Sequence, residues 1–116
     1  MANILKSLGN KITTAATDTL VLDAVPSGKV AIFTSLRAVN MLEHESIKYS
    51  IWIKRANDDI HPLQGNEGIA VCDLPEGATD QHMSGSQEFL QAGDRIYARC
   101  DKDNGLAIVG SYIERG

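Results

Sequence analysis

The fold class follows from residues 90–114, which read LQAGDRIYARCDKDNGLAIVGSYIE. Ile96, Ala98 and Cys100 alternate with Tyr97 and other polar residues, and this period of two is typical of a strand with one face in a core. A second β-rich run follows from residue 106. The Asn-Gly pair between the runs tolerates the positive φ angles of a type I′ turn. The stretch therefore predicts two antiparallel strands joined by a tight hairpin.

Further strand-like segments precede this one, separated by turn residues. The clearest is 47–55, where four β-branched or aromatic residues alternate with Lys48, Ser50, Trp52 and Lys54. Segment 29–40 is apolar on both faces, which predicts a central and most buried strand. The remaining candidates are 2–8, 13–25, 59–63, 69–74 and 87–91. With no helical periodicity over three turns, the sequence predicts an all-β fold, an antiparallel β-sandwich or jelly-roll-like domain of about eight strands.

The chain of 116 residues is about one domain long, and its 43% hydrophobic and 22% charged residues are typical of a globular protein. We expect one β-sandwich domain over residues 1–116. Residues 1–10 are predicted to be a docking arm that adds a strand to a neighbour. Residues 75–86 are small and polar with two glycines, and they are predicted to be a loop.

Charge and hydropathy exclude several function classes. The net charge of −4 and the lack of a basic cluster argue against nucleic acid as a partner. The start lacks the apolar region of a secretory signal, and no stretch has the roughly 18 apolar residues of a membrane helix. We expect synthesis in a host cytoplasm, no membrane association, and free thiols at Cys72 and Cys100 that act as buried small hydrophobes.

Acidic residues are concentrated between positions 56 and 94, where eight of them occur without a lysine or arginine. One interpretation is a solvated acidic surface. The other is that these acidic loops meet a basic face of a neighbouring copy in a symmetric assembly.

Candidate reactive constellations are incomplete. The run from Asp101 has Gly105 where a calcium loop needs a ligand, and the three histidines lie far apart in sequence. Ser84 lacks a nucleophile elbow, and the adjacent carboxylates Asp58 and Asp59 are typical of a turn. We therefore predict no enzyme activity, no catalytic residues, no metal and no cofactor.

Trp52 lies on the polar face of its strand, so it is either covered by other residues or an anchor for a partner. The interface candidates are Trp52, Arg37, Lys54, Arg55, Ile4 and Leu5.

Three stretches, VPSGKVAIFTSLRAVN, YSIWIKRAN and the C-terminal run quoted above, resemble small structural proteins of tailed bacteriophages. The pattern is a Val-Pro-x-Gly-Lys turn, a Ser-Leu-Arg strand with a polar residue near Asn40, Leu-x-x-Gly-Asp, and a final Ser-Tyr-Ile-Glu. Its positions here are Val25, Pro26, Gly28, Lys29, Ser35 to Arg37, Leu90, Gly93, Asp94 and Ser111 to Glu114.

The resemblance implies a virion component with a β-sandwich fold. We expect a capsid cement or decoration protein on the capsid surface, which bridges and stabilises adjacent capsomers. Its partners would be the major capsid protein and copies of itself, as a homotrimer or homodimer. A tail, neck or fibre-associated protein is the alternative. A carbohydrate-binding sandwich, with Trp52 and Tyr49 or Tyr97 as sugar platforms, is a further one.

Overall fold

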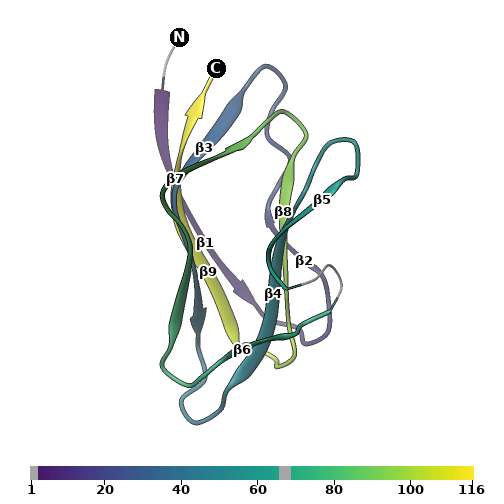
Figure 1. Ribbon diagram of the computed structural model, residues 1–116, viewed down its shortest axis with the longest axis vertical. Helices are drawn as coiled ribbons and strands as arrows, with labels where there is room; N and C mark the ends of the chain where they lie inside the picture. The colour runs from purple at the N-terminus through teal and green to yellow at the C-terminus, as the bar shows by residue number, and fades with distance from the viewer. Residues whose placement is uncertain (1–2, 66–68) are drawn as a thin grey trace.

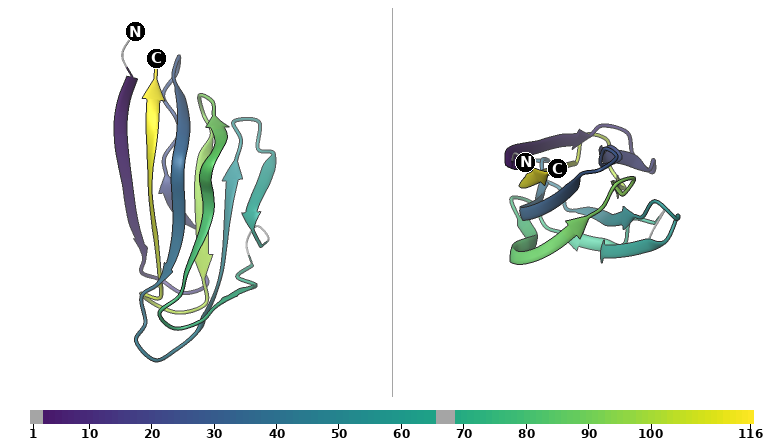
Figure 2. Two further views of the ribbon diagram at one scale, coloured as in Figure 1. Left: turned by 60° about the vertical axis from the view of Figure 1, so that its left-hand side comes forward. Right: turned by 90° about the horizontal axis from the view of Figure 1, so that it is seen from above.

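Two antiparallel sheets pack face to face in the computed structural model of this chain, which describes residues 3–65 and 69–116. Of Asn3 and residues 81–89 it describes the backbone alone. Sheet A has the strand order β1, β9, β3, β7, and sheet B has the order β2, β8, β4, β5, with β6 also pairing with β4 (Figures 1 and 2). The strands are β1 (Asn3–Ile12), β2 (Thr19–Leu22), β3 (Val30–Asn40), β4 (Ile47–Lys54), β5 (Ile60–Gln64), β6 (Cys72–Leu74), β7 (Thr79–Leu90), β8 (Arg95–Cys100) and β9 (Leu106–Arg115). The all-β sandwich predicted from the sequence is confirmed, with nine strands.

The core lies between the two sheets and follows from the period of two. Sheet B contributes the alternate residues of β4 and β8, and sheet A contributes those of β3 and β9, so the apolar faces meet in the middle. Strand β4 is the most buried, whereas the sequence assigned that place to β3. The difference arises because the outward-facing Ser50 and Trp52 of β4 are covered, while Thr34 and Arg37 of β3 are exposed.

The predicted hairpin around Asn104-Gly105 is wrong. β8 belongs to sheet B and β9 to sheet A, so the connection crosses from one sheet to the other. Asn104 has the expected positive φ of 55°, but Gly105 is buried and does not. A Cβ at Gly105 would lie 3.0 Å from Cγ2 of Ile47 and 3.1 Å from Sγ of Cys100. Both runs put apolar residues on one face, and these faces bury more surface by meeting across the core than by lying in one sheet.

The segment predicted to be an N-terminal docking arm is a strand of its own domain. Residues 3–12 form β1, which pairs with β9 at ten positions, from Asn3 opposite Arg115 to Ile12 opposite Leu106. Leu8 and Ile12 point into the core, and the strand continues beyond the predicted end at residue 8. Positions 1 and 2 of the predicted arm lie outside the described residues.

The predicted loop 75–86 is a turn followed by a strand. Residues 75–78 make the turn, in which Ala78 N donates to Pro75 O at 3.1 Å and Gly77 has a φ of 70°. β7 then pairs with β3 at the edge of sheet A. An edge strand packs against one neighbouring strand only, so its sequence is more polar than that of a central strand and reads as a loop.

Gly110 of β9 lies close to the backbone of β3 beside a bulge. The register shifts between Phe33 and Ser35, and a Cβ at Gly110 would lie 2.4 Å from the Ser35 carbonyl oxygen. Gly110→Ala is expected to lower the free energy of unfolding by about 1–3 kcal/mol, because the backbone of a packed sheet must move. Chemical denaturation measures the loss. Gly9→Ala is the matched control, since nothing lies within 4 Å of a Cβ there, and an equal loss in both variants would contradict the prediction.

Candidate functional site

An open depression of about 430 Å³ lies at the end of the sandwich that also carries both chain termini (Figure 1). It is formed by the β4–β5 turn and the β7–β8 turn. Its lining residues are Arg55, Ala56, Asn57, Gln91, Ala92 and Asp94.

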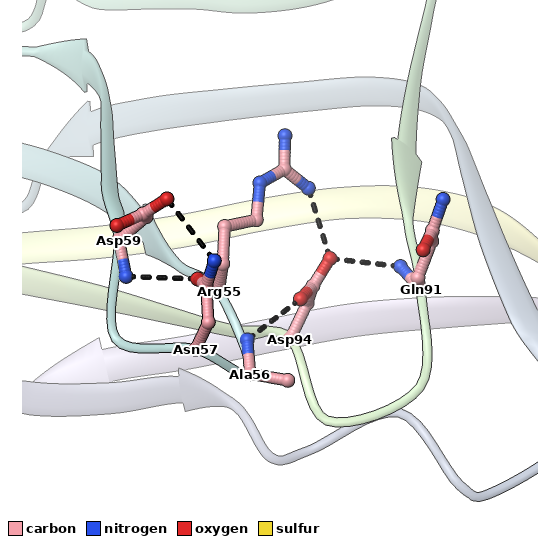
Figure 3. A network of polar contacts seen from close by, with 6 residues as sticks. All are labelled: Arg55, Ala56, Asn57, Asp59, Gln91 and Asp94. Atoms are coloured by element: carbon pink, nitrogen blue, oxygen red, sulfur yellow. Dashed lines mark hydrogen bonds and ion pairs between the residues drawn. The ribbon is translucent and has the colours of Figure 1, made fainter.

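Asp94 is the centre of this site, and its side chain is only 5% exposed. Its carboxylate accepts hydrogen bonds from Arg55 Nη1 at 2.9 Å, Ala56 N at 3.0 Å and Gln91 N at 2.8 Å (Figure 3). A buried carboxylate is stable when such donors replace water. Asp94 therefore joins the two turns.

The backbone around Asp94 requires glycine at the preceding position. Gly93 has a φ of 88°, and a Cβ there would lie 2.7 Å from Cβ of Ala56. Gly93 N donates to Val25 O at 2.9 Å and Val25 N donates to Asp94 O at 3.1 Å, so the β2–β3 connection joins the same end. Both carboxylate oxygens of Asp94 accept hydrogen bonds within the domain, so the described polar groups of the depression hold the turns in place.

A second polar cluster lies at this end around Glu114, whose side chain is 7% exposed. Lys6 Nζ lies 3.2 Å from Oε2 of Glu114, and Lys29 Nζ lies 3.3 Å from Oε1. The hydrogen bond from Lys6, aided by that from Lys29, lowers the pKa of Glu114 against the opposing effect of desolvation. Glu114 thereby keeps its charge and ties β9 to β1 and to the start of β3.

The polar groups within the core also hold parts of the domain together. Tyr49 of sheet B donates a hydrogen bond to Asp80 of sheet A at 2.7 Å, and burial together with this bond raises the pKa of Tyr49. Cys72 and Cys100 are free thiols on the two strands that flank Tyr49. Burial raises the pKa of both, whereas a reactive cysteine needs a lowered one. Cys100 is buried as predicted, and Cys72 is half-buried.

The outer face of sheet B carries an apolar row across four strands. Leu20 lies opposite Tyr97, Tyr97 opposite Trp52, and Trp52 opposite Pro62. The Trp52 and Tyr97 rings stack with centroids 6.2 Å apart. We call Leu20, Tyr97, Trp52 and Pro62 the outer row. Leu20 is 40% exposed and Tyr97 half-buried, so part of the row is open to a partner.

Trp52 itself is 2% exposed, so the prediction that it anchors a partner is wrong and the alternative of a covered side chain holds. Ser50, on the same outer face, is also buried, and its Oγ donates to the carbonyl oxygen of Ile69. Trp52 cannot offer a flat sugar platform, and neither can Tyr49, which lies in the core. Ile69 and Val71, at 57% and 43% exposed, are apolar surface residues that the sequence did not single out as interface candidates.

The other interface candidates do not form one surface. Arg37 is exposed on the outer face of sheet A, and Lys54 is half-buried at the end of β4. Arg55 is engaged with Asp94. Ile4 and Leu5, at 47% and 73% exposed, are neighbours on β1 whose side chains point to opposite faces. Leu5 and Arg37 share the outer face of sheet A, on strands that β9 separates.

The acidic run does not form one surface in the described part of the chain. Asp80 and Asp94 are used inside the domain, and Asp58 pairs with Arg95 at 3.7 Å. Glu67 lies outside the described residues. Among the residues whose side chains the structure describes, 4–65, 69–80 and 90–116, no group of three or more histidine, cysteine or acidic residues is placed to hold a metal ion. The same residues include no helix of the length and apolarity needed to cross a membrane.

Comparisons with known proteins add little. No protein-family model and no curated protein matches the chain. Among solved structures, the chain is similar to the Eiger TNF of S. frugiperda, with 12% identity, a TM-score of 0.34 and coverage of 95% of this chain and 90% of that one. It is also similar to the CBM22-1 xylan-binding domain of Paenibacillus barcinonensis Xyn10C, with 14% identity, a TM-score of 0.28 and coverage of 94% and 70%. At these TM-scores neither likeness supports an inference about ligand or partner.

Proposed function

We propose that this chain is a structural protein of a bacteriophage virion, a cement protein that binds the capsid surface and bridges adjacent capsomers of the major capsid protein. The observation that carries the proposal is the outer row on sheet B. Its partly open apolar side chains suit contact with another protein, and the polar clusters of the domain are engaged in holding its own turns and sheets together.

The residues that carry the phage resemblance support the proposal, because several of them meet in the fold. Val25 exchanges backbone hydrogen bonds with the Gly93-Asp94 turn, and Lys29 pairs with Glu114. The pattern thus describes one end of the sandwich as a unit, although its parts are up to 89 residues apart in sequence.

The mechanism is mechanical. A capsid filled with DNA is under outward pressure, and a protein bound across two capsomers adds contact area that must be lost before they separate. An ordinary specific interface of about 1,200–2,000 Å² is sufficient for each contact. Many copies act in parallel, so the contribution of each one can be modest.

The test is quantitative protein staining of purified particles of a phage that encodes this chain. A cement protein is present in hundreds of copies per particle, whereas a tail or neck protein is present in a few to dozens, and absence from the particle overturns the proposal. Leu20→Glu is expected to reduce occupancy on the shell, because it places a charge in the outer row. Met41→Glu, at a residue 48% exposed in the β3–β4 connection, is the matched control. Glycan binding by the purified protein, with no binding to shells, would instead indicate a carbohydrate-binding module.

A further inference from the structure

One side of β1 has no strand beside it. β1 is the first strand of sheet A and pairs with β9 on its other side, so a row of backbone N–H and C=O groups faces outward along the edge (Figure 2). Such an edge is a template for another strand. Ile4 and Leu5, two of the most exposed large apolar residues in the described ranges, lie at its beginning.

The inward-facing residues of this edge are symmetric in type about Leu8. Residues 4–12 read ILKSLGNKI, and on the inward face the apolar Ile4, Leu8 and Ile12 alternate with the polar Lys6 and Asn10. In an antiparallel pairing of two identical copies centred on Leu8, apolar residues of this face lie opposite apolar ones and polar residues opposite polar ones. The pairs are Ile4 with Ile12, Leu5 with Lys11, Lys6 with Asn10, Ser7 with Gly9, and Leu8 with Leu8 of the second copy.

We propose that β1 pairs with β1 of a second copy of this chain across a twofold axis at Leu8. The pairing joins two four-stranded sheets into one sheet of eight strands. A twofold contact stops at two copies, because both copies use the same β1 edge and none is left for a third copy. The proposal concerns the pure protein and does not depend on the capsid role. If that role holds, each dimer presents two outer rows, which is the bivalency that bridging needs.

Other registers fit the sequence less well. Side chains of residues that lie opposite each other must be on the same face of the sheet. The twofold axis must therefore pass through a residue and not between two residues, and the nearest alternatives are centres at Ser7 and Gly9. Centring on Ser7 places Ile4 opposite Asn10 and Lys6 opposite Leu8. Centring on Gly9 places Ile12 opposite Lys6. Of these three centres, only Leu8 sets the inward apolar residues opposite one another.

The charge on Lys6 is compatible with this pairing. An inward-pointing charge at a sheet edge ordinarily discourages strand addition. Lys6 is neutralised within its own chain by Glu114 at 3.2 Å. Lys11 is exposed on the outer face, where its aliphatic stem can cover Leu5 of the second copy while the ammonium group stays in water.

The test uses the full chain in sedimentation equilibrium, with substitutions at positions 5 and 11. Leu5→Lys sets a lysine against Lys11 of the other copy at two symmetric places, and the dimer is expected to weaken about tenfold. Adding Lys11→Glu to Leu5→Lys replaces the repulsion by attraction and is expected to restore dimerisation. Within one strand these residues lie about 20 Å apart, so coupling between them arises only between copies.

Leu20→Lys is the matched control, because it changes another exposed apolar residue far from this edge and is expected to leave dimerisation unchanged. Circular dichroism checks that each variant is folded. A monomer at every accessible concentration, or an assembly larger than a dimer, would overturn the proposal. Equal weakening by Leu5→Lys with and without Lys11→Glu would overturn it as well. None of these results bears on copy number in the virion.

Discussion

Trp52→Ala is expected to lower the free energy of unfolding by about 3–5 kcal/mol, which is the usual loss for a buried tryptophan. The indole is 2% exposed and stacks on Tyr97 although it lies on the outer face of sheet B. Its removal leaves a cavity under the outer row and exposes the backbone of β4, the most buried strand. Denaturant unfolding followed by far-ultraviolet circular dichroism measures the loss, since the variant lacks the only tryptophan of the chain.

Leu20→Ala is the control for Trp52→Ala. Leu20 belongs to the same outer row but is 40% exposed, so its truncation is expected to cost less than about 1 kcal/mol. A loss below that value for Trp52→Ala would show that the indole is dispensable for folding.

Asp94→Ala is expected to cost about 3 kcal/mol, because it removes three hydrogen bonds and leaves the Arg55 guanidinium and two backbone N–H groups without their acceptor. The β4–β5 and β7–β8 turns then lose their common tie, so amide hydrogen exchange is expected to increase at residues 55–59 and 91–94 more than in the core of β4. Chemical denaturation gives the global loss, and hydrogen exchange locates it.

Asp59→Ala is the matched control for Asp94→Ala, since Asp59 is an exposed aspartate whose carboxylate accepts a hydrogen bond from Asn57 of the same β4–β5 turn. Its replacement is expected to change stability by less than about 0.5 kcal/mol. Similar losses at both positions would contradict the role assigned to the buried carboxylate.

The sequence predicted the strands with a strong period of two and lost accuracy where that period weakens. Segments 29–40 and 47–55 match β3 and β4 to within one residue, because each has apolar residues on a core face. Residues 79–86 of β7 are predicted to be a loop, since their sequence is polar and a single edge contact holds them, whereas the end of β7 falls within the predicted strand 87–91. The connection at Asn104-Gly105 was assigned a hairpin because local turn preference does not report which sheet the next strand joins.

The candidate site could be predicted from the sequence less well than the fold. Asp94 follows Gly93 in the Leu-x-x-Gly-Asp pattern. This pattern indicated a turn, but it did not indicate the hydrogen-bond donors to Asp94 that lie 35 or more residues earlier in the chain. The pairing of Glu114 with Lys6 and Lys29 joins residues from both ends of the chain, and nothing in the local pattern links them. Trp52 alternates with polar residues in the sequence, and only the structure shows that Tyr97 of the neighbouring strand stacks on it and that the side chain is buried.

The position of β9 has a consequence for how the protein is made. This strand follows all the others in the chain, yet it lies between β1 and β3 in sheet A. While the ribosome is still translating residues 106–115, β1 has no neighbour in its own chain and β3 has only β7. Sheet A therefore closes only after residues 106–115 have been made, and a nascent chain that lacks β9 exposes two strand edges to aggregation.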